Sequence, residues 1–156
     1  MVVQQNSVLA TIRSHAAGLK VRASRAPVRV LIVDDEPPIL DFVGRVLRDA
    51  GYVTAVAASG ADALRVAAEL DHIDLLLTDF RMPQMNGDEL ARRLRAADPD
   101  LRVLYLTGFA DHLFLDKGNL WDGEAYLDKP CSVKGLLEAV SLALCGHLVP
   151  NFADRV

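Results

Sequence analysis

The stretch LLLTDFRMP, from Leu75 to Pro83, joins a run of apolar residues to an acidic residue directly behind it. Residues 73–78 (IDLLLT) are almost continuously apolar, which is typical of a central parallel strand that is covered on both faces. Asp79 follows at the point where such a strand would end. A lone ionised carboxylate is costly to bury unless a cation or hydrogen-bond donors meet it. We therefore expect other parts of the chain to supply partners for Asp79.

Similar strand-like segments occur along the chain and alternate with segments of helical period. The predicted strands are residues 28–33, 52–57, 73–78, 102–107 and 124–129. The predicted helices begin near Pro37, Ser59, Gly87, Ala110 and Ser132. Strands that alternate with helices indicate an α/β fold, with a five-stranded parallel sheet and helices on both faces.

The length of 156 residues is enough for one globular domain with an appendage, and 51% hydrophobic with 24% charged residues is ordinary for such a domain. No apolar run approaches the roughly 18 residues that a membrane span needs, and the first residues lack the apolar region and cleavage site of a signal peptide. The sequence therefore predicts a cytoplasmic protein without a membrane span.

Residues 1–27 form a basic N-terminal extension with four cations and no acid. Those cations are Arg13, Lys20, Arg22 and Arg25. The rest of the chain then holds 17 − 4 = 13 cations against 21 acids, a balance of −8, which disfavours direct nucleic-acid binding by the main body. The extension is either an amphipathic helix that docks on a partner or mediates pairing, or a frayed tail. The apolar side of that helix would be Val8, Leu9, Ile12, Ala16 and Leu19.

Polar side chains follow several predicted strands at the same edge of the sheet. Asp34 and Asp35 come after the first strand and Asp79 after the third, while Thr107 ends the fourth strand and Lys129 follows the fifth. Functional groups of open parallel sheets collect past the carboxyl ends of the strands, and right-handed crossovers make the first and third strands plausible neighbours. We therefore expect these side chains to converge.

Clustered carboxylates repel one another, so such a cluster indicates a shared hard cation. Mg²⁺ fits Asp34, Asp35 and Asp79, because it binds a few carboxylate oxygens and keeps waters that a phosphate can replace. The hydroxyl of Thr107 and the ammonium of Lys129 would bind the oxygens of a transferred phosphoryl group. Asp79 would be the nucleophile that forms an acyl phosphate.

Each of these residues alone has a simpler interpretation. Asp34 or Glu36 would serve as a helix cap, Lys129 would be a solvated charge and Thr107 a strand-end hydroxyl. Their combination at one edge of the sheet favours the functional interpretation.

Four segments carry a family resemblance. They are LIVDDEP, LLLTDFRMPQMNG, YLTG and YLDKP, in this order, with 22 residues from Thr107 to Lys129. With these segments, residues 28–146 resemble the receiver domain of bacterial response regulators, and residues 147–156 remain as a short C-terminal tail. The resemblance implies a flavodoxin-like sheet in the order 2-1-3-4-5. It also implies a signalling protein, not an enzyme, that catalyses only its own phosphorylation and dephosphorylation.

The resemblance implies a role for each matching residue. Asp79 would accept a phosphoryl group from a histidine kinase or phosphotransfer protein. The Mg²⁺ ligands would be Asp34, Asp35, Asp79 and the backbone carbonyl of Arg81. Thr107 and Lys129 would bind the phosphoryl group, Tyr126 would be the aromatic switch, and Pro83 and Gly87 would shape the loop after Asp79. Phosphorylation would reshape the surface of the fourth helix, fifth strand and fifth helix and thereby control binding of a downstream protein.

Two bulky residues, Arg81 and Phe109, depart from the family pattern. Arg81 and Phe109 flank the expected phosphoryl position, and our hypothesis is that they hinder the hydrolytic water and prolong the phosphorylated state. Trp121 is either a partner-facing aromatic or a local core anchor, and we expect the core anchor.

Two other classes of protein, a phosphatase and a module that is never phosphorylated, require different residues at the site. Haloacid-dehalogenase-like phosphatases usually carry a second aspartate two residues after the nucleophile, and Arg81 stands there instead. A module of the same fold that is never phosphorylated would not need the five polar residues at the sheet edge.

Since the tail is too short for an output domain, we expect a stand-alone receiver or one cut from a hybrid histidine kinase. A homodimer through the fourth helix, fifth strand and fifth helix, or through the N-terminal segment, stays open.

Overall fold

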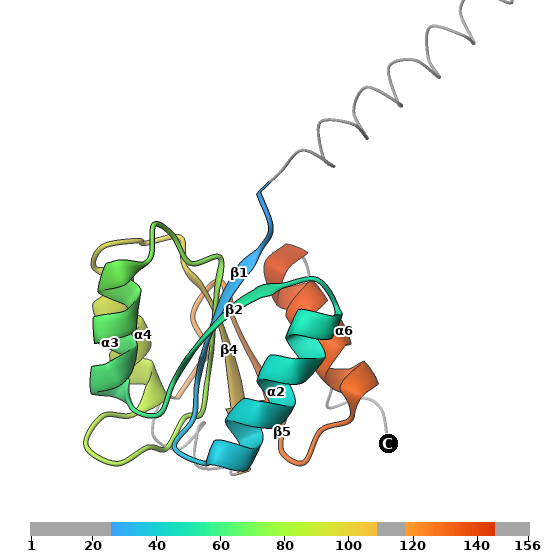
Figure 1. Cartoon of the computed structure of the whole chain (residues 1–156). Coiled ribbons are helices and arrows are strands. Elements are labelled where there is room, and N and C mark those ends of the chain that lie inside the picture. Colours follow the sequence, from blue (N-terminus) through green and yellow to red (C-terminus); the bar gives the residue numbers. More distant parts are fainter. Residues whose placement is uncertain (1–25, 109–117, 146–156) are drawn as a thin grey trace, which may run out of the picture.

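The computed structural model describes residues 26–108 and 118–145, which form a parallel β-sheet between two layers of helices (Figure 1). The strands are β1 (Arg29–Val33), β2 (Val53–Ala57), β3 (Leu75–Thr78), β4 (Arg102–Thr107) and β5 (Glu124–Asp128). The helices in the described part are α2 (Pro37–Asp49), α3 (Gly60–Glu69), α4 (Gly87–Arg95) and α6 (Val133–Cys145). The sheet order is β2-β1-β3-β4-β5 and every neighbouring pair is parallel, which confirms the predicted fold and strand order. The helix predicted near Ala110 lies outside the described residues.

Local sequence signals determine where the helices begin and end. Pro37 occupies the first turn of α2, where its missing N–H costs no hydrogen bond. Gly51 follows that helix with a φ of 93°, a left-handed conformation that glycine adopts without strain. The Ser59 hydroxyl accepts a hydrogen bond from the backbone N–H of Asp62 at 3.1 Å and so caps α3. No helix in the two described ranges is long and apolar enough to cross a bilayer.

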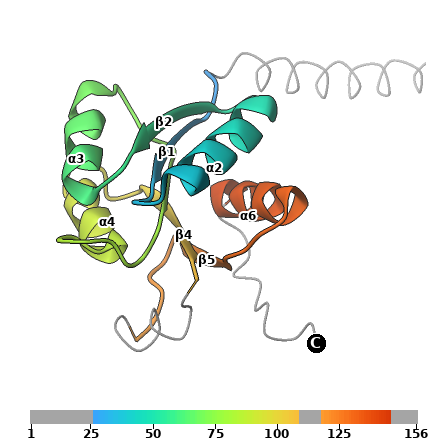
Figure 2. The ribbon, with the colours of Figure 1, turned by 60° about the horizontal axis from the view of Figure 1, so that its bottom comes forward.

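The sheet separates two hydrophobic cores. The core beneath α3 and α4 contains alternate residues of the central strands, namely Leu31, Val33, Leu76, Val103 and Tyr105. The core beneath α2 and α6 contains the intervening residues, namely Val30, Ile32, Leu75, Leu77, Leu104 and Leu106. Figure 2 shows these two helix pairs on opposite faces of the sheet. The run before Asp79 is continuously apolar because β3 contributes buried residues to both faces of the sheet.

A buried polar network ties α4 to β4 and β5 at the start of β5. The Glu124 carboxylate accepts hydrogen bonds from the Arg95 guanidinium at 3.1 Å and from the Tyr105 hydroxyl at 3.0 Å. Burial, followed by the charge and hydrogen bond of Glu124, raises the pKa of Tyr105, which therefore stays protonated. Trp121 lies next to this network with 54% of its surface exposed, so the prediction that it is a core anchor was wrong. Its backbone N–H, not its ring, makes the 2.9 Å contact with Glu124.

Candidate functional site

The register of the central strands brings the acidic residues together. Val33 of β1 is paired with Thr78 of β3, so Asp34 and Asp79 both stand one residue beyond this pair. The backbone N–H of Asp79 donates to the Val33 carbonyl at 2.9 Å, which extends the pairing past the strand ends. Carboxylate oxygens of Asp34, Asp35 and Asp79 all lie within 4.8 Å of one another. The predicted convergence of these three residues is thus observed.

Lys129 reaches the same cluster from β5. Its Nζ atom lies 2.7 Å from Asp34 Oδ2 and 3.6 Å from Asp79 Oδ2. The backbone N–H of Lys129 donates to the Thr107 carbonyl at 2.9 Å, which fixes the chain directly after β5. Pro130 follows through a cis peptide bond. An ammonium group therefore meets the buried carboxylate that ends the apolar run of β3.

Glu36 also faces this ammonium, with its Oε2 atom 3.9 Å from Lys129 Nζ. The sequence interpretation gave Glu36 only a capping role, although it is the third acid of the DDE run after β1. Its side chain is largely exposed, so it adds negative charge at the rim of the cluster rather than inside it.

Burial and charge perturb the ionisable groups of the cluster. Only 2% of the Asp34 side chain and 13% of the Asp79 side chain are exposed. Burial raises the pKa of Asp79 to about 6, with the Lys129 charge acting in the opposite direction and the Asp34 charge adding to the rise. Burial opposes the charged form of Lys129, but the hydrogen bond of Asp34 and the charges of Asp79, Asp34 and Glu36 outweigh it and raise the pKa.

The loop after Asp79 is held close to that residue by its backbone. The N–H of Gly87 donates to the Phe80 carbonyl at 2.7 Å, and a Cβ atom on Gly87 would lie 2.2 Å from the Asp79 carbonyl oxygen. Only glycine allows this approach. Pro83 and Arg81 are both exposed in this loop. The predicted loop-shaping position of Gly87 therefore has a direct steric reason.

Thr107 and Tyr126 lie on the two strands that complete this side of the sheet. Thr107 ends β4 and is buried, with 1% of its surface exposed. Tyr126 is partly buried against the core beneath α3 and α4, and its register partner is Tyr105. Phe109 lies outside the described residues.

The donor set fits a hard divalent cation. Three carboxylates offer oxygen ligands within reach of one another, and Asp35 is exposed, so that the cluster opens to solvent. An ammonium that already contacts Asp34 offsets part of the negative charge. Such a site can hold a small anion between a cation and Lys129.

A 2-1-3-4-5 parallel sheet with an acidic cluster past β1 and β3 defines a flavodoxin-like α/β protein with its site at the topological switch point. The sequence matches the family described as response regulator receiver domain over residues 30–141. The chain therefore belongs to the response regulator receiver domain family, a class of signalling modules.

Individual relatives agree with this assignment. The response regulator receiver protein CpdR of Brucella abortus (strain 2308) is 34% identical over 116 residues, which cover 74% of this chain and 96% of CpdR. The sensor kinase CckA of the same organism is 35% identical over 112 residues, 71% of this chain but only 12% of CckA. The crystal structure of the receiver domain from hybrid histidine kinase CckA superposes with a TM-score of 0.64 at 32% identity, covering 74% of this chain and 98% of that domain. Similar receivers thus occur in small proteins and in long kinases.

Proposed function

We propose that this protein is a phosphoacceptor whose Asp79 receives a phosphoryl group from a histidine kinase or phosphotransfer protein. A carboxylate oxygen of Asp79 attacks phosphorus, an acyl phosphate bond forms, and the phosphorus–nitrogen bond of the phosphohistidine breaks. The bonding electrons remain on the imidazole nitrogen, which takes up a proton. The proposal rests on one observation above all, the position of Lys129 Nζ 3.6 Å from Asp79 Oδ2.

The metal ligands in this proposal are Asp34, Asp35, Asp79 and the backbone carbonyl of Arg81. Bound Mg²⁺ would supply charge neutralisation and alignment of the phosphoryl oxygens. Lys129 holds one phosphoryl oxygen through its ammonium, and the Thr107 hydroxyl donates to another. Asp34 keeps Lys129 in place through the 2.7 Å contact.

The output of the phosphorylated state is a rearrangement on β4 and β5. Thr107 moves toward the phosphoryl group and leaves space for Tyr126 to turn inward, which shifts the population between two packings. The affected surface comprises β5, α6 and the segment near Ala110, and it controls binding of a downstream protein or of a second copy. We assign residues 28–146 to the receiver, residues 1–27 to an extension and residues 147–156 to a tail, in a cytoplasmic protein.

The test is phosphotransfer from acetyl phosphate in the presence of Mg²⁺. Wild-type protein should gain the mass of one phosphoryl group, and Asp79→Asn should gain none. Asp100→Asn, which alters an exposed carboxylate outside the cluster, is the matched control and should react like wild type. A wild-type protein that takes up no phosphoryl group from acetyl phosphate or from a phosphorylated histidine kinase would be an interaction module of the same fold instead.

A further inference from the structure

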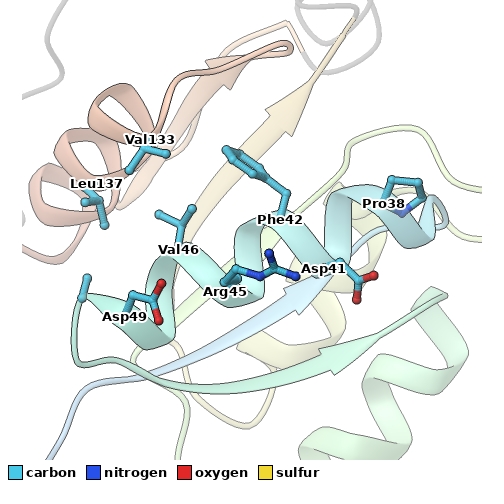
Figure 3. A pocket seen from close by; sticks show the side chains of 9 residues that line it. Pro38, Asp41, Phe42, Arg45, Val46, Asp49, Val133 and Leu137 are labelled. Carbon is cyan, nitrogen blue, oxygen red and sulfur yellow. The ribbon is translucent and has the colours of Figure 1, made fainter.

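A second concave surface lies between α2 and α6, on the other side of the sheet from α3 and α4. It is a groove of about 700 Å³. The lining residues are Pro38, Asp41, Phe42, Arg45, Val46, Asp49, Ala50, Val133 and Leu137. Figure 3 shows Phe42 and Val46 of α2 facing Val133 and Leu137 of α6 across this gap. Phe42 is 36% and Val133 50% exposed, so the groove presents apolar surface to solvent.

The chain enters the domain beside one end of this groove. The backbone N–H of Val53 donates to the Val28 carbonyl at 2.9 Å, and that of Tyr52 donates to the Leu47 carbonyl at 3.0 Å. Val28 is therefore adjacent to the turn that follows α2. Asp49 and Ala50, at the end of α2, line the groove at this point. Any segment that precedes Val28 is tethered next to the groove.

The sequence of residues 8–19 matches the groove in pattern and length. At about 100° per residue, Val8, Leu9, Ile12, Ala16 and Leu19 fall within about one third of a helix circumference. A helix of these 12 residues would be about 18 Å long, compared with about 20 Å for the 13 residues of α2. The eight residues 20–27 that join it to Val28 can span at most about 26 Å, so the whole groove is within reach.

The charges of the two partners are also complementary. Residues 1–27 carry four cations and no acid, whereas the rest of the chain has a balance of −8. Asp41 and Asp49 flank Arg45 along the groove, so the charged lining residues carry a net charge of −1. Arg13 and Lys20 border the apolar stripe of the N-terminal segment at helical spacing. Opposite charges at the rim favour a basic occupant of the groove, such as this segment, over an acidic one.

We propose that residues 8–19 dock as an amphipathic helix in the groove between α2 and α6 of the same chain. The apolar stripe covers Phe42, Val46, Val133 and Leu137, and the basic residues lie toward Asp41 and Asp49. The short tether keeps the segment at an effective concentration in the millimolar range, so modest affinity is enough for high occupancy. This proposal does not depend on phosphorylation of Asp79.

The test uses methyl NMR on the full chain with wild type, Ile12→Glu and Ser14→Glu. Ile12 lies within the apolar stripe, whereas Ser14 lies opposite to it at helical spacing, so the two variants add the same charge on different sides. In wild type, nuclear Overhauser contacts should connect the Ile12 methyl with methyl groups of Val133 or Leu137. Ile12→Glu should shift the methyl signals of Val46, Val133 and Leu137, and Ser14→Glu should leave them unchanged.

Signals of buried methyl groups, such as those of Leu76 and Leu104, report whether each variant keeps its core. Equal shifts in both variants, or none in either, would overturn the proposal. A mixture of differently labelled chains distinguishes the occupants, because contacts seen only between chains would assign the groove to a second copy and also overturn it. Contacts from Leu148 or Phe152 in place of Ile12 would assign the groove to the C-terminal tail, with the same consequence.

Discussion

Asp79 carries a charge that its buried surroundings accommodate poorly. Its pKa is raised to about 6 from an ordinary value of 3.8, because burial outweighs the attraction of Lys129. The folded protein thus binds the Asp79 proton more tightly than the unfolded chain does. The resulting stability is fully present below pH 3.8 and is lost as the pH rises through about 6. At neutral pH, without a cation, the ionised carboxylate therefore destabilises the fold.

Asp79→Asn should consequently stabilise the metal-free protein at pH 7.5, by about 1–2 kcal/mol after allowance for solvent screening. The difference should shrink below pH 6 and vanish well below pH 3.8, where the carboxyl group is protonated in both states. Urea denaturation in the presence of a chelator, at several pH values, measures it. Asp100→Asn is the control and should show no such pH-dependent gain. An Asp79→Asn protein that is less stable than wild type at pH 7.5 would contradict the argument.

The second prediction at the residue scale concerns Arg81 and Phe109, and it rests on the proposed function. The family resemblance implies that both residues flank the phosphoryl group, where their bulk would hinder the hydrolytic water. Arg81→Ala combined with Phe109→Ala should therefore shorten the lifetime of the phosphorylated protein severalfold. Loss of phosphate after removal of acetyl phosphate, followed by mass spectrometry, measures this lifetime. Phosphate loss at the wild-type rate would show that neither side chain shields the acyl phosphate.

At the scale of elements, α4 begins directly against the backbone of Asp79. A Cβ atom on Gly87 would lie 2.2 Å from the Asp79 carbonyl oxygen, and backbone atoms leave that contact no flexible way to relax. Gly87→Ala should therefore cost about 1–3 kcal/mol of stability. In α2, the atoms nearest to a Cβ on Gly44 belong to the end of the flexible Arg48 side chain, the closest at 2.9 Å. Gly44→Ala is thus the matched control.

The control should move stability in the opposite direction, with a gain of about 0.5–1 kcal/mol, because alanine favours the interior of a helix. Chemical denaturation of both variants gives the comparison. If Gly87→Ala matched Gly44→Ala, the close approach of α4 to Asp79 would be wrong.

The link between α4 and β5 supports a further prediction at this scale. The Arg95 side chain is 12% and that of Glu124 1% exposed. Removing the basic partner of a buried carboxylate is strongly destabilising. Arg95→Met should cost about 3 kcal/mol or more of stability. Arg65→Met removes an ion pair with Asp62 on the exposed face of α3 and should change stability little. Equal losses in the two variants, measured by thermal denaturation, would contradict this distinction.

Elements also differ in how well the sequence predicted them. The strand 102–107 was predicted with the observed bounds, whereas the strand predicted at 73–78 begins only at Leu75. The difference arises because Asp74 accepts a hydrogen bond from the Arg29 N–H through its side chain, which precedes the regular ladder. The Glu124 network was not predicted, since a single glutamate at the start of a strand resembles a surface residue and Arg95 stands 29 positions away. Periodicity identifies elements, but it does not identify polar contacts between them.

At the scale of the whole molecule, parallel pairing determines which residues meet. Right-handed crossovers and the apolar character of β3 predicted the convergence of Asp34, Asp35 and Asp79. The particular pairing of Lys129 with Asp34 at 2.7 Å was not predicted, because it depends on the β4–β5 register and on the length of chain after β5. The family resemblance implied a role for each of these residues, whereas the pairing of the strands explains why they lie close together.

Since two distant segments of the chain, after β1 and after β3, contribute carboxylates to one cluster, cation binding should stabilise the molecule as a unit. A ligand that binds only the folded state adds RT ln(1 + [L]/Kd), about 2.7 kcal/mol when free Mg²⁺ is 100 times Kd. Thermal unfolding of wild type should therefore shift upward with increasing Mg²⁺, and the shift should be lost in Asp35→Asn and in Asp79→Asn. Asp100→Asn should keep it, because that residue follows α4 and lies outside the cluster. A Mg²⁺ response that persists in Asp35→Asn would place the cation elsewhere and would contradict the assignment of this cluster as the cation site.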